Sequence, residues 1–309
     1  MEYKNNNWIG GGEMGNKKVD LNTVVDTLQC DILREKMENE RILMDEHHAY
    51  IKPSTSQRVD DNYNRVKISP KHLIGYENTN SRKNIDMAMS TIAERIGVTK
   101  MDIDVNRMDI SIDSNLNYED YKKFHLYLFE LITYKESHNK KILCTSLESY
   151  KDNNIYLNSR DLKLSIYNKG FESKGEHPYS TRIEFRWIRY ASLETDKMAK
   201  RVINRLKDIE NNNTELESKL IDRLSKNYEE EKAKGEIKTF TEYVRKYDKF
   251  FYTRNIIKGV YDSTGLKGNF NTWLKEFKIK QPSFRYYTLK DVKTYRDSII
   301  KSVKAFIKS

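Results

Sequence analysis

Three short segments in the middle of the chain alternate between apolar and polar residues. In 106–114, two isoleucines and a methionine are separated by charged or hydroxyl residues. Because successive side chains of a β-strand point to opposite faces, this segment has one apolar and one polar face. Segments 162–169 and 182–188 alternate in the same way, and 154–159 supplies the other arm of a hairpin with 162–169. The pattern predicts an antiparallel sheet with one buried face.

Helical spacing of apolar residues surrounds these strands. It occurs over 84–97 and 118–135, and the second of these helices is expected to pack on the apolar face of the sheet. Residues 20–45 are also predicted to be helical, because leucine, valine and isoleucine recur there at steps of three and four. The predicted fold class is α+β: a central antiparallel β-sheet with helices packed on one face, followed by a mostly α-helical C-terminal region.

Composition divides the chain into three parts. Residues 1–18 are polar and contain four glycines, so they are predicted to form a flexible leader. Residues 19–194 are expected to form the α+β catalytic domain. Residues 195–309 are expected to form a helical, basic, DNA-binding region, in which 253–277 also fits a helix-turn-helix or an ordinary pair of helices joined through glycine.

The basic charge is concentrated near the C-terminal end. The net charge is +10, and residues 251–309 contain thirteen Lys or Arg and four acidic residues, with aromatic residues between them. A basic surface with aromatic side chains favours a nucleic acid as partner, and a lysine-rich solvated surface is the alternative. The candidate phosphate-binding residues in this segment are Lys275, Lys278, Lys280 and Arg285.

Several classes of protein are excluded by what the sequence lacks. No apolar run is long enough to cross a membrane, and no signal-peptide core begins the chain, so we expect a cytoplasmic protein without a membrane partner. The two cysteines, Cys30 and Cys144, match no zinc spacing and no disulfide framework. There is no P-loop motif and no pair of histidines on a strand. A P-loop helicase, a P-loop kinase and a histidine-metal relaxase are thereby excluded.

The polar faces of the strands hold residues suited to phosphodiester chemistry. A tyrosine hydroxyl attacks phosphorus only when its proton is removed and the charge on the phosphate is neutralised. Tyr167 is the candidate nucleophile, and carboxylates select Mg²⁺ or Mn²⁺ as the cofactor. The candidate metal ligands are Asp109, Glu184 and, less securely, Asp113.

Other polar residues of the same strands are assigned supporting roles. Lys169 follows Tyr167 by two positions and is expected to favour the phenolate or hold the scissile phosphate. Glu172 is a candidate assisting acid and Tyr156 a candidate second nucleophile. The arginines expected to bind phosphates are Arg107, Arg182 and Arg186. The same pattern also describes an ordinary antiparallel sheet whose polar face is solvated.

The motifs resemble those of rolling-circle replication initiators. The blocks RMDISID (107–113), YLNSRDLKLSIYNKGFE (156–172) and RIEFR (182–186) look like the three signature blocks of that family. The nearest resemblance is to the gene II proteins of filamentous phages and related phage or plasmid replication proteins, and staphylococcal plasmid initiators are more distant look-alikes. The segment VKISPKHLIGYEN (66–78) is similar to a further element of gene II proteins. The resemblance covers about residues 64–190, and the C-terminal region after them shows none.

The resemblance implies a DNA nickase and strand transferase. Tyr167 would be the nucleophile, with Lys169 beside it, and Asp109 and Glu184 would be the acids of the Arg-x-Asp and Arg-x-Glu strands. Such proteins cut one strand at a plasmid or phage origin, keep the 5′ phosphate as a phosphotyrosine ester, and leave a 3′ hydroxyl that primes synthesis. Origin DNA, double- and single-stranded, would be the partner, with a host helicase and DNA polymerase as further candidates. The oligomeric state, including a dimer, stays open.

Two other functions fit the same residues. A non-catalytic, sequence-specific DNA-binding initiator or repressor would have a basic region and an acidic sheet face without chemistry. A mobilisation relaxase would share the tyrosine chemistry but serve conjugative transfer.

Overall fold

A seven-stranded antiparallel sheet forms the centre of the computed structural model, which describes residues 7–9, 17–33, 51–53, 63–137, 154–158, 162–188 and 194–309. The strand order is β4-β5-β3-β6-β9-β8-β7, and every neighbouring pair is antiparallel. The predicted α+β class with a central antiparallel sheet is confirmed. The strands of this sheet are β3 (Leu21–Leu33), β4 (Ile51–Pro53), β5 (Tyr63–Ile68), β6 (Ile103–Ser114), β7 (Asn154–Asn158), β8 (Leu162–Asn168) and β9 (Thr181–Trp187).

The register aligns the polar residues of β6, β9 and β8 in rows across the sheet. Asp109 is opposite Arg186, and Asp113 is opposite Arg182. Tyr167 is the neighbour of Arg182 on the other side. Opposed residues of an antiparallel pair share a face, so these side chains lie on one surface of the sheet.

The helix predicted over residues 20–45 is wrong for its first half, which forms strand β3, while residues 34–45 lie outside the described residues. The register of β3 on β6 shifts between Val25 and Thr27 and again between Gln29 and Cys30. A β-bulge inserts an extra residue and breaks the alternation of period two. Buried residues that would be two apart become three apart, as in Val25 and Leu28, and this spacing imitates a helix.

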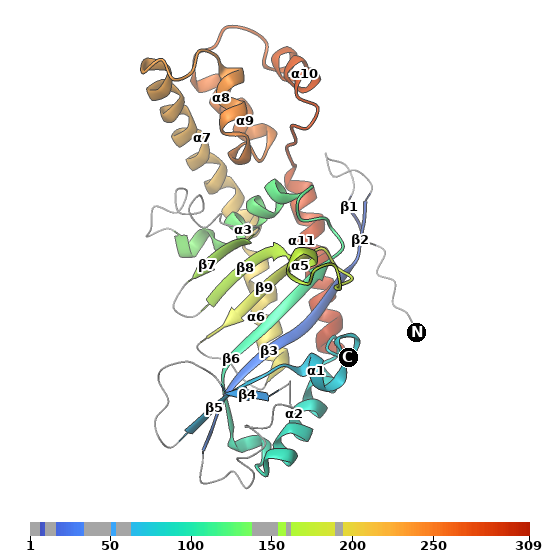
Figure 1. The fold of residues 1–309 in the computed structure, drawn as a ribbon. Helices are drawn as coiled ribbons and strands as arrows, with labels where there is room; N and C mark the ends of the chain where they lie inside the picture. Colours follow the sequence, from blue (N-terminus) through green and yellow to red (C-terminus); the bar gives the residue numbers. More distant parts are fainter. Residues whose placement is uncertain are drawn as a thin grey trace.

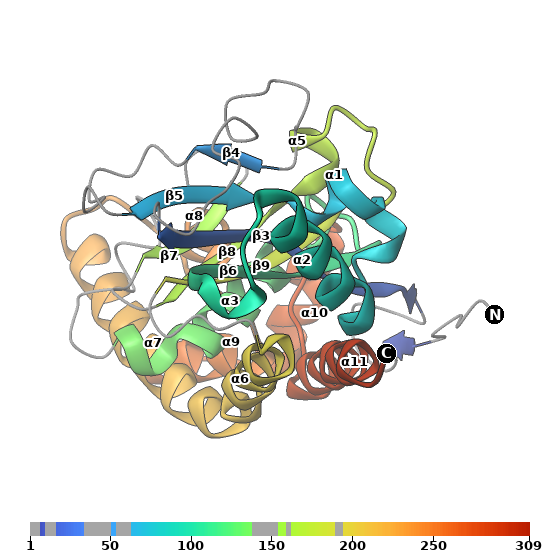
Figure 2. The same ribbon diagram turned by 90° about the horizontal axis from the view of Figure 1, so that it is seen from below.

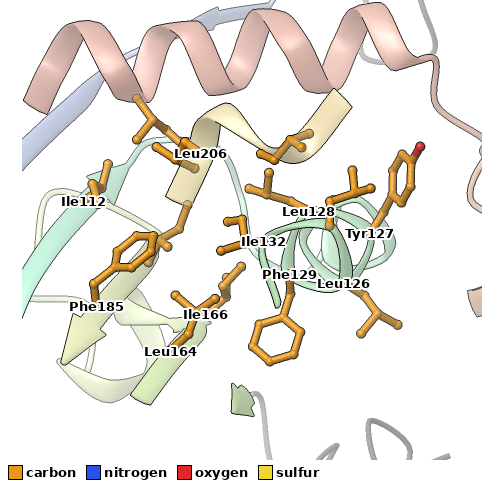
Figure 3. Packing of buried hydrophobic residues seen from close by; sticks show 14 of the residues in the cluster. Ile112, Leu126, Tyr127, Leu128, Phe129, Ile132, Leu164, Ile166, Phe185 and Leu206 are labelled. Carbon is orange, nitrogen blue, oxygen red and sulfur yellow. The ribbon is translucent and has the colours of Figure 1, made fainter. Parts of the chain in front are cut away.

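Three long helices cover the apolar face of the sheet; α3 was predicted there, whereas α6 and α11 come from the region 195–309 that was expected to form a separate DNA-binding part. Figure 2 shows α3, α6 and α11 on one side of the sheet and the short helices α1 and α5 on the other. In Figure 3, Phe185, Leu164 and Ile166 from the strands face Ile132 of α3 and Leu206 of α6. The helices around the sheet have these bounds: α1 (Pro70–Ile74), α2 (Arg82–Ile96), α3 (Lys122–Ser137), α5 (Lys169–Glu172), α6 (Thr195–Lys207) and α11 (Leu289–Lys308).

The polar face is partly covered too, which the sequence did not predict. Helix α1 and the 3-10 turn Tyr76–Asn78 lie against it near β3, and α5 lies beside β9. Asp109, Asp113 and Glu184 on this face are buried rather than solvated.

Residues 195–309 are helical, as predicted, but they occupy two places. Helices α6 and α11 pack on the sheet and on each other. Helix α7 extends away from the sheet and ends in a group of shorter helices, here called the helical head (Figure 1). The head comprises the far end of α7 (Ile209–Ala233) with α8 (Phe240–Lys246), α9 (Arg254–Ser263) and α10 (Phe270–Lys280).

The N-terminal region contains a second, small sheet. Strands β1 (Asn7–Ile9) and β2 (Lys17–Val19) pair antiparallel beside α11, so the expected leader is not structureless throughout. The rest of that leader lies outside the described residues. In the part of the chain that the structure describes, no helix combines the length and the apolar character that crossing a bilayer requires.

Candidate active site

Tyr167 lies on the polar face near the end of β8, partly exposed, with its hydroxyl directed at Glu184. Tyr167 Oη donates a hydrogen bond to Glu184 Oε2 at 3.3 Å. Glu184 is on the adjacent strand β9 and is buried. The candidate nucleophile therefore has a carboxylate in contact with the proton that it must lose.

Asp109 joins this pair through an arginine. Arg186 donates from Nη2 to Glu184 Oε1 at 2.8 Å and from Nε to Asp109 Oδ2 at 3.2 Å. Arg107 binds the same aspartate with two donors, at 2.9 Å and 2.5 Å. The structure thus brings Tyr167, Glu184 and Asp109 together, from three neighbouring strands that the chain visits at widely separated positions.

The electrostatic field of the site holds the phenol protonated and makes Glu184 a stronger base. Burial, and next the Glu184 carboxylate, raise the pKa of Tyr167 well above its ordinary value. Burial and the nearby Asp109 raise the pKa of Glu184. A carboxylate with a raised pKa accepts a proton more readily, as a general base for a phenol requires.

Asp113 is placed in a structural ion pair, which corrects its assignment as a metal ligand. Arg182 donates to both of its oxygens, at 2.5 Å and 2.8 Å, and Tyr76 Oη donates to it at 2.5 Å. Its side chain is 0% exposed and that of Arg182 is 1% exposed. The carboxylate oxygens of Asp113 are occupied by buried donors, and Arg182 is too deeply buried to meet a DNA phosphate as predicted. Both residues instead fix the end of the sheet next to Tyr167.

Asp26 is a site residue that the sequence interpretation missed. It is the extra residue of the β3 bulge. Its carboxylate accepts a hydrogen bond from Arg182 Nη1 at 2.7 Å and forms an ion pair with Lys71, whose Nζ lies 3.5 Å away. Burial opposes its ionisation, but Arg182 and then Lys71 outweigh burial and lower the pKa of Asp26. The sequence predicts a helix over residues 20–45, and a helix there gives no signal that would place this aspartate on the sheet.

Tyr76 and His177 were missed as well. His177 contacts the Tyr76 ring edge-on and places Nε2 at 3.7 Å from Asp113. Burial lowers the pKa of His177, although Asp113 opposes this. Tyr76 was within reach of the sequence, because it belongs to the segment 66–78 that resembles a gene II element. His177 had no distinguishing pattern.

Lys169 is not on the strand as predicted but is the first residue of α5, because β8 ends at Asn168. The Asn168 side chain caps this short helix by accepting from Phe171 N. The Lys169 ammonium lies 5.8 Å from the centre of the Tyr167 ring and pairs with Glu172. Both predicted residues are thus beside Tyr167, with Glu172 more than half exposed.

The remaining predicted residues lie elsewhere. The backbone of Tyr156 pairs with Ser165 on β8, one row away from Tyr167. The four basic residues predicted to bind phosphate belong to α10 and the loop after it, in or next to the helical head and away from the polar face of the sheet, as Figure 1 shows for α10. They are Lys275, Lys278, Lys280 and Arg285.

A divalent cation fits the donors that the site offers. Mg²⁺ is commonly bound by one or two carboxylates together with waters and substrate phosphates. Asp109 and Glu184 supply two carboxylates, and Ser111 Oγ, buried opposite Glu184, has no hydrogen-bond partner among the described residues. Within those residues no cluster of three acidic, histidine or cysteine side chains could hold a metal, so the other ligands would come from water and DNA.

Comparison with known proteins identifies no family. No protein-family model matches the chain, and no curated protein sequence matches it. Among solved structures, the chain is similar to one described as "Structure of Rolling Circle Replication Initiator Protein from Geobacillus stearothermophilus", with 11% identity and a TM-score of 0.36. The similarity covers 61% of this chain and 85% of that chain. A likeness this distant carries no argument, so the functional conclusion depends on the site and its motifs.

Proposed function

We propose that this protein is a replication initiator that nicks one DNA strand with Tyr167 and retains the cut end as a phosphotyrosine ester. The observation that carries the proposal is the hydrogen bond from Tyr167 Oη to Glu184, beside a second carboxylate on the adjacent strand. An ordinary solvated sheet face has no need to bury acids beside a tyrosine hydroxyl.

The reaction balances with the residues present and water. Glu184 accepts the proton of Tyr167, and Oη attacks the phosphorus of a phosphodiester. A bond from oxygen to phosphorus forms, and the bond to the 3′ oxygen breaks. The leaving 3′ oxygen, in line with Oη on the opposite side of the phosphorus, takes a proton from water and becomes a 3′ hydroxyl, and Glu184 releases its proton to solvent. Mg²⁺ or Mn²⁺ held by Asp109 and Glu184 would neutralise charge on the phosphate.

The helical head would bind the origin duplex. Helix α10 carries the exposed Lys275 and Lys280 and the half-buried Lys278, and the exposed Arg285 follows it. These residues give this part of the molecule a basic surface that suits a phosphate backbone. Plasmid or phage DNA is the substrate that the sequence motifs suggest.

A covalent adduct tests the chemistry. The protein is incubated with Mn²⁺ and supercoiled DNA carrying its own coding region and flanks, then digested with nuclease and analysed by mass spectrometry. We expect a nucleotide on Tyr167, and none in Tyr167→Phe. Tyr179→Phe, a half-buried tyrosine nearby, is the matched control that keeps activity, and Tyr156→Phe tests for a second nucleophile. Full nicking by Tyr167→Phe would contradict the proposal by assigning the cut to another group. Absence of both a nick and an adduct in the wild type would also contradict it, and would leave a non-catalytic DNA-binding initiator as the alternative.

A further inference from the structure

Arg186 lies between the two carboxylates that would have to bind a shared cation. Its guanidinium bridges Asp109 and Glu184, with 32% of its side chain exposed. The two carboxylates are 1% and 7% exposed. Arg186 is therefore the part of this cluster that solvent and DNA reach most easily.

The bridge leaves little free capacity on the acids. Asp109 accepts from Arg107 on both oxygens and from Arg186 on one of them. Glu184 accepts from Arg186 on one oxygen and from Tyr167 on the other. All four carboxylate oxygens thus have a donor, and a cation reaches both acids only after Arg186 has moved.

A DNA phosphate is the group suited to move it. A guanidinium binds phosphate with two parallel hydrogen bonds, and its long side chain can turn toward solvent without a change in the strand. A phosphate placed for attack by Tyr167 would lie close to Arg186, because Arg186 and Tyr167 both contact Glu184.

We propose that Arg186 is a latch on the cation site, which opens when DNA binds. In the free protein Arg186 and Arg107 together balance the charges of Asp109 and Glu184, and the Arg186 bridge keeps divalent cations bound only weakly. When a backbone phosphate takes the Arg186 guanidinium, Glu184 Oε1 loses its donor and Asp109 Oδ2 keeps only the one from Arg107, so both oxygens can accept a cation. Cation and DNA then bind cooperatively, and each raises the affinity for the other by the same factor. This inference rests on the proposed function, since it assumes that the cation and DNA share the site.

The direct test is to measure Mn²⁺ binding without DNA. Binding is detected by the loss of the electron paramagnetic resonance signal of the free ion, or by calorimetry. We expect Arg186→Gln to bind Mn²⁺ about tenfold more tightly than the wild type, a typical size for such coupling. Lys163→Gln is the matched control, because Lys163 is opposite Arg186 on β8 and its removal changes the charge equally. The control should change the Mn²⁺ affinity little. Arg186→Lys should have an affinity between those of the wild type and Arg186→Gln.

A second arm measures the coupling itself. A mixed-sequence single-stranded 20-mer should tighten Mn²⁺ binding by the wild type and have little effect on Arg186→Gln. Thermal unfolding of each variant checks that it is folded. Unchanged or weaker Mn²⁺ binding by Arg186→Gln, or an equal gain in Lys163→Gln, overturns the latch while leaving a Tyr167 adduct intact. Absence of Mn²⁺ binding in every protein, with or without DNA, overturns both the latch and the metal dependence of the proposed reaction.

Discussion

At the scale of single residues, the geometry around Tyr167 depends on side chains outside the Tyr167–Glu184–Asp109 group. Asp113 and Arg182 are buried at the end of the sheet and form a cluster with the half-buried Tyr76, and Arg182 also binds Asp26 in the β3 bulge. This cluster fixes the strand that carries Tyr167, because Arg182 is the cross-strand neighbour of Tyr167. Two acids near the tyrosine therefore have different roles. Asp113 holds the strands in place through its ion pair with Arg182, whereas Glu184 accepts the hydrogen bond from the Tyr167 hydroxyl.

We expect Asp113→Asn to destabilise the protein by about 3–5 kcal/mol, because it leaves the buried charge of Arg182 without its main partner. The measurement is urea unfolding at neutral pH. Asp196→Asn is the control, since Asp196 pairs with Lys200 on the surface, and should cost less than about 1 kcal/mol. Equal losses in the two variants would show that the Asp113 pair is not the structural element described here.

His125 should make stability depend on pH. It is fully buried on α3, stacked on Tyr118, and its Nδ1 has no hydrogen-bond partner within the described part of the chain. Burial lowers its pKa to about 3. The unfolded chain binds a proton at His125 below about pH 6.5, whereas the folded protein does not, so stability falls as the pH decreases.

Between pH 7 and pH 5, His125 should contribute a loss of about 2 kcal/mol. Urea unfolding at the two pH values measures this, and His125→Phe should remove that part of the difference. His72→Gln, which alters an exposed histidine, should leave most of it in place. A pH dependence that is unchanged in His125→Phe would assign the effect to other groups.

At the scale of secondary structure, local patterns predicted the individual strands better than the elements that pack around them. The alternation in β6, β8 and β9 gave the correct faces, and those faces place Asp109, Tyr167 and Glu184 together. Strand β3 was misread because its bulges give its buried residues helical spacing. Tyr76 and Asp113 are 37 residues apart, and the sequence held no information on strand order that could bring them into contact.

The packing of α9 on α7 depends on a glycine. A Cβ added at Gly259 would lie 2.4 Å from Cδ1 and 2.8 Å from Cγ1 of Ile221. We expect Gly259→Ala to destabilise the protein by about 1–3 kcal/mol, because Ile221 must leave its position. In an Ile221→Ala background the same change should instead stabilise by about 1 kcal/mol, the helix preference of alanine over glycine.

Urea unfolding of the four proteins in this double-mutant cycle measures the coupling between the two sites. Additive effects would mean that the cost of a Cβ at position 259 does not arise from Ile221, which would contradict the close contact between them.

At the scale of the whole molecule, the basic segment 251–309 is divided between the core beside the sheet and the helical head, and the sequence did not predict this division. Helix α11 buries Val292, Tyr295 and Val303 against the rest of the protein, whereas α10 is in the head. Deleting residues 251–309 would remove part of the core along with the proposed DNA-binding surface, so substitutions are the better test.

Replacing Lys275, Lys278 and Lys280 with glutamine should weaken DNA binding and its dependence on salt. Each lost phosphate contact lowers the slope of log K against log salt by about 0.9, so we expect a reduction of about 2–3. Fluorescence anisotropy with a duplex at several salt concentrations measures the slope. The control replaces three exposed lysines of α11 with glutamine and should change the slope less: Lys301, Lys304 and Lys308. An equal reduction in both triple variants would indicate a diffuse charge effect.

The last helix lies against the first long strand. Thr23 of β3 and Ser302 of α11 share a hydrogen bond of 2.8 Å across 279 positions of the chain. During synthesis, the apolar side of the sheet beside β3 has no cover until α11 has emerged from the ribosome. In a nascent chain this part of the sheet would therefore stay uncovered while the next 279 positions were translated, and β3 would be open to non-native contacts during that time.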